Sequence, residues 1–249
     1  MRYILVIDET SFYHPELTNK LLSLNEPECV GCLLVTGAPS RNSLLYKTSK
    51  KILYFGFYES IKFTLRFLKL IFKPHLRSVA YQLRKNKIDF MKVKSDINTT
   101  SIINWVEKKH CDFIFASTTL IIKKELLDLP RCGCINRHSS LLPGYAGLWP
   151  IFHACLNGEK ETGVTLYLMS EKIDQGKILA QKKYSLDAGK SLDQLYQENF
   201  SYVPEMFKAA VDALINKKYL VNMDNVSSYY GFPEAAQIKE FRRLGGKFI

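Results

Sequence analysis

Short apolar runs alternate with amphipathic segments along the first half of the chain. Runs that are almost wholly apolar and bounded by turn residues are typical of strands buried on both faces of a sheet. We therefore expect strands at Arg2 to Asp8, Cys29 to Thr36, Ile88 to Val93, Asp112 to Ala116 and Cys132 to Ile135.

The segments between these runs carry apolar residues at helical spacing. They predict helices at Leu17 to Leu24, Tyr54 to Phe72, Val79 to Asn86 and Ile102 to Lys109. Strands that alternate with helices form parallel sheets covered by helices. The pattern therefore predicts an α/β protein with a Rossmann-like, mostly parallel sheet and helices on both faces.

The second half of the chain continues with strands predicted at Gly163 to Leu168 and Lys177 to Tyr184. Ser191 is a suitable N-cap for a helix from Leu192 to about Asn216. We expect residues 1–190 to form the main domain and residues 191–249 a short C-terminal helical extension packed on it. The aromatic and basic tail of this extension would close over the substrate side.

Residues 38–51 are rich in Gly, Pro, Ser, Asn and Lys and predict a flexible basic loop. The following helix, 54–72, combines aromatic and aliphatic residues with Lys62, Arg66 and Lys69, which lie on one stripe. Its internal charges argue against a membrane span. It can pack on the sheet, pair with a second subunit in a homodimer, or lie on a membrane surface.

The composition says more about the class of binding partner than about the fold. The 249 residues are 47% hydrophobic, which is ample for a core, and their formal net charge is +11. Such a surplus favours an anionic partner, whether a nucleotide, a nucleic acid or an acidic membrane.

The six cysteines do not resemble a secreted disulfide framework, and the N-terminus reads as a strand rather than a signal peptide. A cytoplasmic protein is the simpler expectation. Cys29 and Cys32 have the spacing of metal ligands, with Cys132 and Cys134 far downstream. Both pairs lie in apolar, strand-like runs, so buried thiols are expected and no metal site is predicted.

Three polar side chains are the main candidates for chemistry. Asn136 and His138 stand two positions apart after a buried strand, so they point the same way. Ligands of open α/β sheets bind at this end of the strands. Asp174 follows the next strand in a turn. Each residue also has an ordinary structural explanation, as a turn residue or a buried imidazole.

The joint pattern resembles the folate-dependent formyltransferase family. The matching segments are Gly133-Cys-Ile-Asn-Arg-His138, Ser140-Leu-Leu-Pro143, Gly147, Pro150, Gly158, Thr162-Gly-Val-Thr165 and Asp174-Gln-Gly176. They occur in the family's order, and the similarity is clear over about residues 110–185. The chain departs from the family at Ser117, Ala146 and Tyr167; the last stands where many relatives have a second histidine.

The resemblance implies a formyltransferase catalytic domain that uses N10-formyltetrahydrofolate as donor and no metal. It implies that Asn136 and His138 stabilise the oxygen of a tetrahedral intermediate, and that Asp174 accepts a proton. Loops expected to line the folate pocket contribute Thr119, Leu120, Ile121, Ile122, Ser170 and Ile173. Tyr145 and Trp149 are candidates for stacking on a substrate base.

The acceptor expected from this resemblance is a nucleotide-linked amino sugar, as in the short sugar N-formyltransferases of surface glycan (lipopolysaccharide O-antigen) biosynthesis. The first strand is not followed by the glycine-rich phosphate loop of glycinamide ribonucleotide formyltransferases, and only about 65 residues follow Tyr184. On this reading no nucleic acid partner is expected. A methionyl-tRNA formyltransferase that grips tRNA with its basic helix remains an alternative. A non-catalytic protein on a membrane surface is a third.

Overall fold

Among the residues described by the computed structural model, which are 1–249 apart from 11, 38–43, 188 and 224–226, eight strands form one sheet. Their order across the sheet is β3 (Phe90–Val93), β2 (Glu28–Val35), β1 (Arg2–Asp8), β4 (Phe113–Ser117), β5 (Cys134–His138), β7 (Glu161–Met169), β8 (Gly176–Ser185) and β9 (Val221–Met223).

The sheet is parallel from β3 to β5 and antiparallel from β5 to β9. The predicted α/β fold with a mostly parallel sheet is therefore confirmed. Strand β1 lies inside the parallel part, and its side chains from Tyr3 to Ile7 are completely buried. This burial on both faces explains why the sequence there is continuously apolar rather than alternating.

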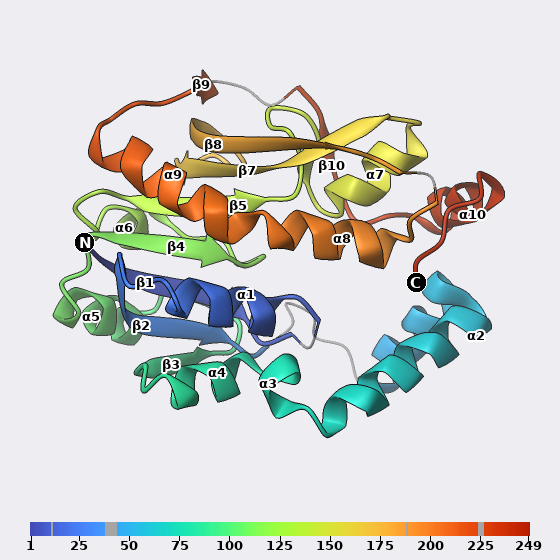
Figure 1. The fold of residues 1–249 in the computed structure, drawn as a ribbon, viewed down its shortest axis with the longest axis horizontal. Helices are drawn as coiled ribbons and strands as arrows, with labels where there is room; N and C mark the ends of the chain where they lie inside the picture. The colour runs from blue at the N-terminus through green and yellow to red at the C-terminus, as the bar shows by residue number, and fades with distance from the viewer. Residues whose placement is uncertain (11, 38–43, 188, 224–226) are drawn as a thin grey trace.

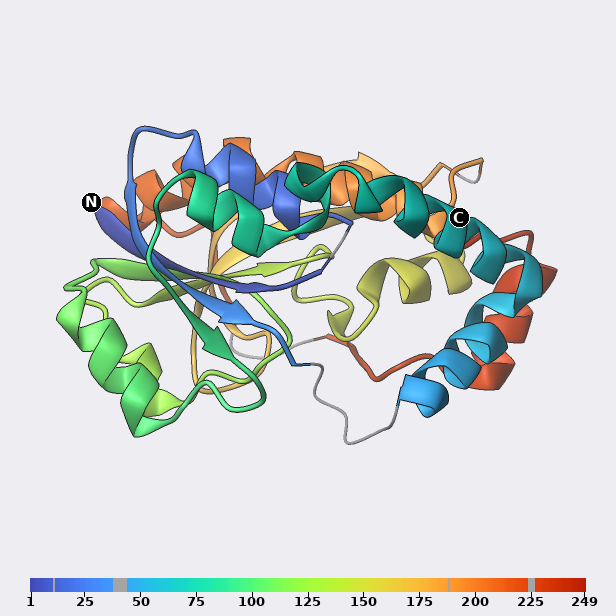
Figure 2. The same ribbon diagram turned by 90° about the horizontal axis from the view of Figure 1, so that it is seen from below.

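Helices cover both faces of the sheet, as Figures 1 and 2 show. Tyr3, Leu5 and Ile7 pack in one core cluster with residues of α1 (His14–Leu22), α4 (Val79–Lys85) and α9 (Val203–Ile215). Ile4 and Val6 point the other way, into a cluster with α5 (Thr100–Lys108) and α6 (Lys124–Leu127). The strand's alternation thus divides one apolar sequence between two cores.

Helix α2 (Leu44–Ile71) lies at the edge of the molecule beside the C-terminus, and α3 (Pro74–Arg77) follows it (Figure 1). The predicted helix 54–72 is confirmed, although Gly56 interrupts it with a φ of 71°. The predicted loop 38–51 is wrong over residues 44–51, which are helical; they contain neither Gly nor Pro and are rich in helix formers such as Leu and Lys. Residues 38–43 lie outside the described residues.

The predicted helix from Leu192 to Asn216 is two helices, α8 (Leu192–Ser201) and α9, joined at Tyr202. Pro204 stands in the first turn of α9, where its missing N–H costs nothing, and this explains why a new helix begins there. The predicted N-cap is confirmed, because the Ser191 side chain accepts a hydrogen bond from the backbone N–H of Gln194, in a capping box.

The tail contains regular structure that its sequence pattern did not indicate. Strand β10 (Tyr229–Tyr230) pairs with β6 (Ala146–Gly147), and α10 (Ala235–Arg243) packs against α7 (Pro150–Leu156). An aromatic cluster that includes Phe152, Phe241 and Phe248 fills the space between them. The tail therefore holds the loop after β5 in place.

Candidate active site

Asn136 and His138 lie at the carboxyl end of β5 and share one face of the strand, as their spacing predicts. Asp174 comes from the turn between β7 and β8 and is buried with them. Its Oδ1 is 3.6 Å from Nδ1 of His138. The three side chains thus lie close together, although Asn136 and Asp174 are 38 positions apart in the sequence.

The imidazole of His138 is buried, with 7% of the residue's surface exposed. Its Nε2 is 2.8 Å from the backbone carbonyl of Tyr145. A carbonyl only accepts, so Nε2 carries the hydrogen of the neutral ring and Nδ1 is the nitrogen that can take up or release a proton. That nitrogen is the one that faces Asp174.

The carboxylate of Asp174 is fixed by two further hydrogen bonds. Its Oδ2 accepts from the backbone N–H of Gly147 at 2.7 Å, and its Oδ1 accepts from the hydroxyl of Tyr167 at 3.0 Å. The residue itself has a φ of 51°, in the left-handed region that Asp tolerates in turns. These contacts fix the orientation of the Asp174 carboxylate in the site.

Tyr167, a departure from the family pattern, is a further member of the site. It lies opposite Asn136 in the antiparallel register of β5 and β7. Its hydroxyl accepts a hydrogen bond from the Asn136 amide at 3.0 Å and donates to Asp174. Burial raises the pKa of this phenol well above its usual value, and the negative charge of Asp174 acts in the same direction.

The carbonyl oxygen of the Asn136 side chain is buried and has no hydrogen-bond partner among the described residues. An unpaired buried acceptor costs about 1–3 kcal/mol. The Asn136 amide is thus held through its nitrogen, by the hydroxyl of Tyr167.

The remaining family-like segments hold the loop that follows β5. The Thr165 hydroxyl donates to the carbonyl of Ser140 at 2.6 Å and accepts from the backbone N–H of Leu142 at 3.1 Å. Gln181 donates to Thr165 and to the carbonyl of Leu142, at 2.9 Å each. A Cβ on Gly163 would lie 2.3 Å from the side chain of Leu141 and 2.5 Å from the backbone carbonyl oxygen of Lys182, so only glycine fits at this position.

The two aromatic candidates occupy different surroundings. The ring of Tyr145 stacks on Tyr230, with centroids 5.3 Å apart, and its hydroxyl donates to Glu159 at 2.7 Å. Trp149 packs against an aromatic group made up of Phe152, Phe232 and Phe248. Both rings are half-buried, and their role in stacking on a base stays a prediction.

The segments predicted to line a folate pocket lie side by side. Lys124, just after the loop that follows β4, forms an ion pair with Glu171 of the turn that carries Asp174, at 3.4 Å. Ile121 and Ile173 are 62% and 49% exposed on these two segments, Leu120 is half-buried, and Thr119 and Ser170 are exposed. Ile122 is different, because it is 4% exposed and packs in the core near α5 and α6.

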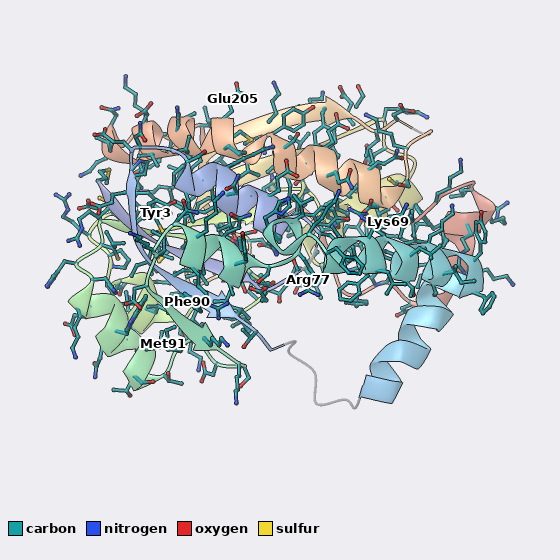
Figure 3. All side chains as sticks on the ribbon, turned by 60° about the horizontal axis from the view of Figure 1, so that its bottom comes forward. Tyr3, Lys69, Arg77, Phe90, Met91 and Glu205 are labelled. Atoms are coloured by element: carbon teal, nitrogen blue, oxygen red, sulfur yellow. The ribbon has the colours of Figure 1, made fainter. Side chains whose placement is uncertain are left out.

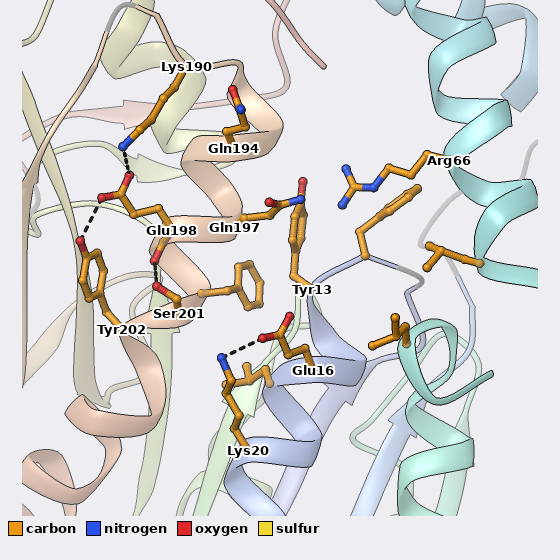
Figure 4. A pocket seen from close by; sticks show the side chains of 15 residues that line it. Tyr13, Glu16, Lys20, Arg66, Lys190, Gln194, Gln197, Glu198, Ser201 and Tyr202 are labelled. Atoms are coloured by element: carbon orange, nitrogen blue, oxygen red, sulfur yellow. Dashed lines mark hydrogen bonds and ion pairs between the residues drawn. The ribbon is translucent and has the colours of Figure 1, made fainter. Parts of the chain in front are cut away.

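A pocket of about 710 Å³ lies between α1, α2, α3 and α8, on the face of the sheet opposite to the one that carries Asn136 and His138 (Figure 4). Phe200 of α8 lines it and stacks under the guanidinium of Arg137, which points to this face between Asn136 and His138. Charged groups of its lining are already paired, Lys20 with Glu16 and Lys190 with Glu198. Arg66 pairs with Asp193 at its border.

The thiols show no arrangement for a metal. Cys29 and Cys32 lie on β2, and burial raises the pKa of Cys29 to about 11. Within the described ranges, no group of three or more His, Cys, Asp or Glu side chains is placed to hold a metal ion.

Residues 79–211, more than half of the chain, match the family model described as formyl transferase. The chain therefore belongs to the formyl transferase family, as the sequence resemblance predicted. The fold agrees with this assignment across several solved members.

Curated relatives in sequence are methionyl-tRNA formyltransferases. That of Wolbachia pipientis subsp. Culex pipiens is 31% identical over 170 residues, which cover 65% of this chain and 55% of the relative. That of Lysinibacillus sphaericus is 39% identical over 104 residues, or 42% of this chain and 33% of the relative. The chain thus spans about a third to a half of the length of these relatives.

Solved structures with the same fold include several kinds of formyltransferase. A sugar 3N-formyltransferase, WlaRD, solved with dTDP and 5-N-formyl-THF, has a TM-score of 0.56 and 18% identity, covering 93% of this chain and 70% of that one. The N-formyltransferase of Helicobacter canadensis, in complex with folinic acid and dTDP-3-aminofucose, has a TM-score of 0.58 and 17% identity, covering 98% and 81%. Phosphoribosylglycinamide formyltransferase of Bacillus halodurans has a TM-score of 0.60 and 19% identity, covering 89% and 100%.

Proposed function

We propose that this protein transfers a formyl group from N10-formyltetrahydrofolate to the amino group of a nucleotide-linked amino sugar. The observation that carries the proposal is the convergence of Asn136, His138 and Asp174 at the carboxyl end of β5, in a chain of the formyl transferase family. Each of the three supplies a different function that formyl transfer requires.

The donor supplies an activated formyl carbon, and the amine attacks it to form a new C–N bond. The negative charge that develops on the formyl oxygen needs donors in fixed positions. A protonated Nδ1 of His138 is one such donor, since Nε2 is committed to Tyr145. The bond from the formyl carbon to the folate nitrogen then breaks, and a proton replaces the carbon on that nitrogen.

The attacking amine must lose a proton during transfer. Asp174, 3.6 Å from His138, is positioned to accept this proton directly or through a water, while its bonds from Gly147 and Tyr167 keep it oriented. The Asn136 amide has a second N–H besides the one bonded to Tyr167, and it can donate to the formyl oxygen and so orient the formyl carbon toward the amine.

The residues present fit a folate. The exposed Ile121 and Ile173 offer apolar contact on two segments that an ion pair joins next to Asp174. Main-chain groups of residues 119–121 and of Ser170 would complete the pocket, whereas Ile122 supports it from the core.

Two structural neighbours support the sugar acceptor: one is described as a sugar 3N-formyltransferase and was solved with dTDP, and the other is described as an N-formyltransferase and was solved with dTDP-3-aminofucose. The net charge of +11 suits a diphosphate-bearing substrate. The sequence relatives favour a second candidate, formylation of methionyl-tRNA.

The decisive experiment offers the protein amino-sugar nucleotides and formylated folate and detects product by mass spectrometry as a gain of one formyl group. We expect His138→Ala to lose about 10²–10⁴-fold of the rate with folding intact. His75→Ala, at an exposed histidine of α3, is the matched control and should retain it.

The same preparation is then offered aminoacylated initiator tRNA. If the protein formylates the tRNA, and binds it in a way that weakens steeply with salt, methionyl-tRNA rather than an amino sugar is the acceptor. Turnover near that of the unmodified protein in His138→Ala would refute the site itself.

A further inference from the structure

We propose that α2 and α3 form a membrane-docking surface that seats this protein on an anionic lipid bilayer. The proposal concerns a face of the molecule that takes no part in the proposed formyl transfer. It stands on exposure, spacing and charge along residues 57–77.

One side of α2 faces the rest of the protein. Arg66 pairs with Asp193 at the start of α8 and lies over the ring of Phe12, and Phe63 contacts the same ring. Glu59 accepts a hydrogen bond from the backbone N–H of Phe248 at 2.8 Å and lies 3.8 Å from Arg242. These contacts fix which side of the helix points outward.

The outward side is an apolar stripe. Phe57, Ile61, Leu65, Leu68 and Phe72 succeed one another at intervals of four, four, three and four, and are 76%, 42%, 53%, 48% and 89% exposed. This spacing places the first four in one row along α2, and Phe72 directly follows the last residue of the helix. Large side chains rarely remain this exposed in an unbroken row on a protein that has no partner there.

A basic edge runs beside the stripe. Lys62 and Lys69 each follow a stripe residue by one position, and Lys73 and Arg77 continue the row into α3 (Figure 3 labels Lys69 and Arg77). The acidic residue of this segment, Glu59, is turned inward to Phe248 and Arg242. The surface therefore offers apolar and positive groups together and no negative one.

The combination of apolar and basic side chains indicates what binds to this surface. Two copies of the chain that paired through this surface would each present the same patch, so the lysines would meet no acidic group. An anionic bilayer supplies negative headgroups at the level of the lysines and acyl chains below the stripe, and Tyr58, beside Lys62, suits the boundary between them. In the part of the chain that the structure describes, no helix is long and apolar enough to cross a bilayer, so the helix would lie along the surface.

The test is flotation of the full chain with vesicles of phosphatidylcholine alone or with about a third phosphatidylglycerol. We expect at least about tenfold more bound protein on the anionic vesicles, declining as salt rises. Leu65→Ser/Leu68→Ser should abolish binding, and Lys62→Gln/Lys69→Gln should lower it to the level of the neutral vesicles.

The control variants carry substitutions of the same type at exposed positions outside the docking surface. Ile215→Ser removes an apolar side chain that is 52% exposed on α9, and Lys208→Gln/Lys217→Gln removes two exposed charges; both should bind like the unmodified protein. Circular dichroism checks the fold of every variant.

Absence of flotation with anionic vesicles, or equal binding by the stripe variant and Ile215→Ser, would overturn the proposal. So would a concentration-dependent dimer in sedimentation that Leu65→Ser/Leu68→Ser dissociates, since the stripe would then bind a second copy. Vesicle binding involves no formyl group, so this result is independent of the outcome for the proposed function.

Discussion

The hydroxyl of Tyr167 lies 3.0 Å from Oδ1 of Asp174 and 3.0 Å from the amide nitrogen of Asn136, and so connects two of the three candidate catalytic side chains. The third, His138, reaches Asp174 through the same oxygen. A strand residue opposite Asn136 therefore sets how the amide and the carboxylate are oriented.

Replacing Tyr167 by Phe removes both hydrogen bonds and leaves Asp174 with one fewer donor. We expect formyl transfer to fall by at least about tenfold, mainly in kcat, because the donors and the base lose their alignment. Tyr167→His, which restores a ring N–H, should recover part of the rate. Tyr229→Phe, at a tyrosine that is 58% exposed, is the control, and an unchanged kcat in Tyr167→Phe would show that the hydroxyl has no such role.

Replacing Gly147 should be far more damaging than replacing Gly158, because only Gly147 lies against another backbone segment. Both have positive φ, 95° and 72°, but a Cβ on Gly147 would lie 2.1 Å from the carbonyl of Tyr230, whereas one on Gly158 would meet nothing within 4 Å. We expect Gly158→Ala to cost about 1 kcal/mol of unfolding free energy from backbone strain alone.

Gly147→Ala should cost clearly more, since it also separates β6 from β10 and displaces the N–H that binds Asp174. Urea unfolding of both variants measures the difference, and the transfer assay should show a loss of rate for Gly147→Ala only. Equal destabilisation by the two substitutions would contradict the role of the close contact.

The buried guanidinium of Arg137 is stabilised by a hydrogen bond to Asn199. It donates to Asn199 and to Ser139, its Nε has no partner among the described residues, and burial lowers its pKa to about 10. Asn199→Leu would leave this charge poorly solvated and also remove the hydrogen bond to the carbonyl of Gly163, at 2.7 Å. We expect a loss of about 3 kcal/mol of unfolding free energy.

A double variant separates the two causes. Arg137→Met removes the charge, so Arg137→Met/Asn199→Leu should be more stable than Asn199→Leu in urea unfolding. If the second substitution lowers stability further, the charge is not the source of the loss.

His14 should make stability depend on pH. It is buried between Thr10 and Ser117, and burial lowers its pKa to about 3, from about 6.5 in an unfolded chain. Between these values the unfolded state binds a proton that the folded state does not, so this contribution is complete above pH 6.5 and is lost as pH falls toward 3. The loss should reach about 2 kcal/mol at pH 5.

The measurement is urea unfolding at pH 7 and pH 5 for the unmodified protein and for His14→Gln. Other groups titrate in both proteins, so the difference between their pH dependences isolates His14. A parallel decline of the two proteins would show that His14 is protonated in the folded state.

Much of the fold could be predicted because its signals are local. Strand β1 reads as an apolar run since it is buried on both faces, and the alternation of runs and amphipathic segments determines a mostly parallel sheet. The break at Tyr202 between α8 and α9 carried a signal, Pro204, that the apolar spacing on either side obscured.

The candidate site was predictable where spacing within a strand defines direction, as for Asn136 and His138. It was not predictable where distant segments meet. The pairing of β10 with β6, the N–H of Gly147 on Asp174 and the position of Tyr167 all depend on tertiary contacts, and backbone groups leave no mark in a sequence. Tyr167 could have been found by setting the antiparallel register of β5 against β7.

The short ladder between β6 and β10 has a consequence for how the protein is made. Backbone groups of Ala146 and Leu148 are bonded to Ser228 and Tyr230, which are translated some eighty positions later. A growing polypeptide can complete its parallel strands on the ribosome while the loop over His138 still lacks these partners. The enzyme would thus acquire its final geometry only after residues 228–230 have emerged, and nascent chains halted before that point should be folded but inactive.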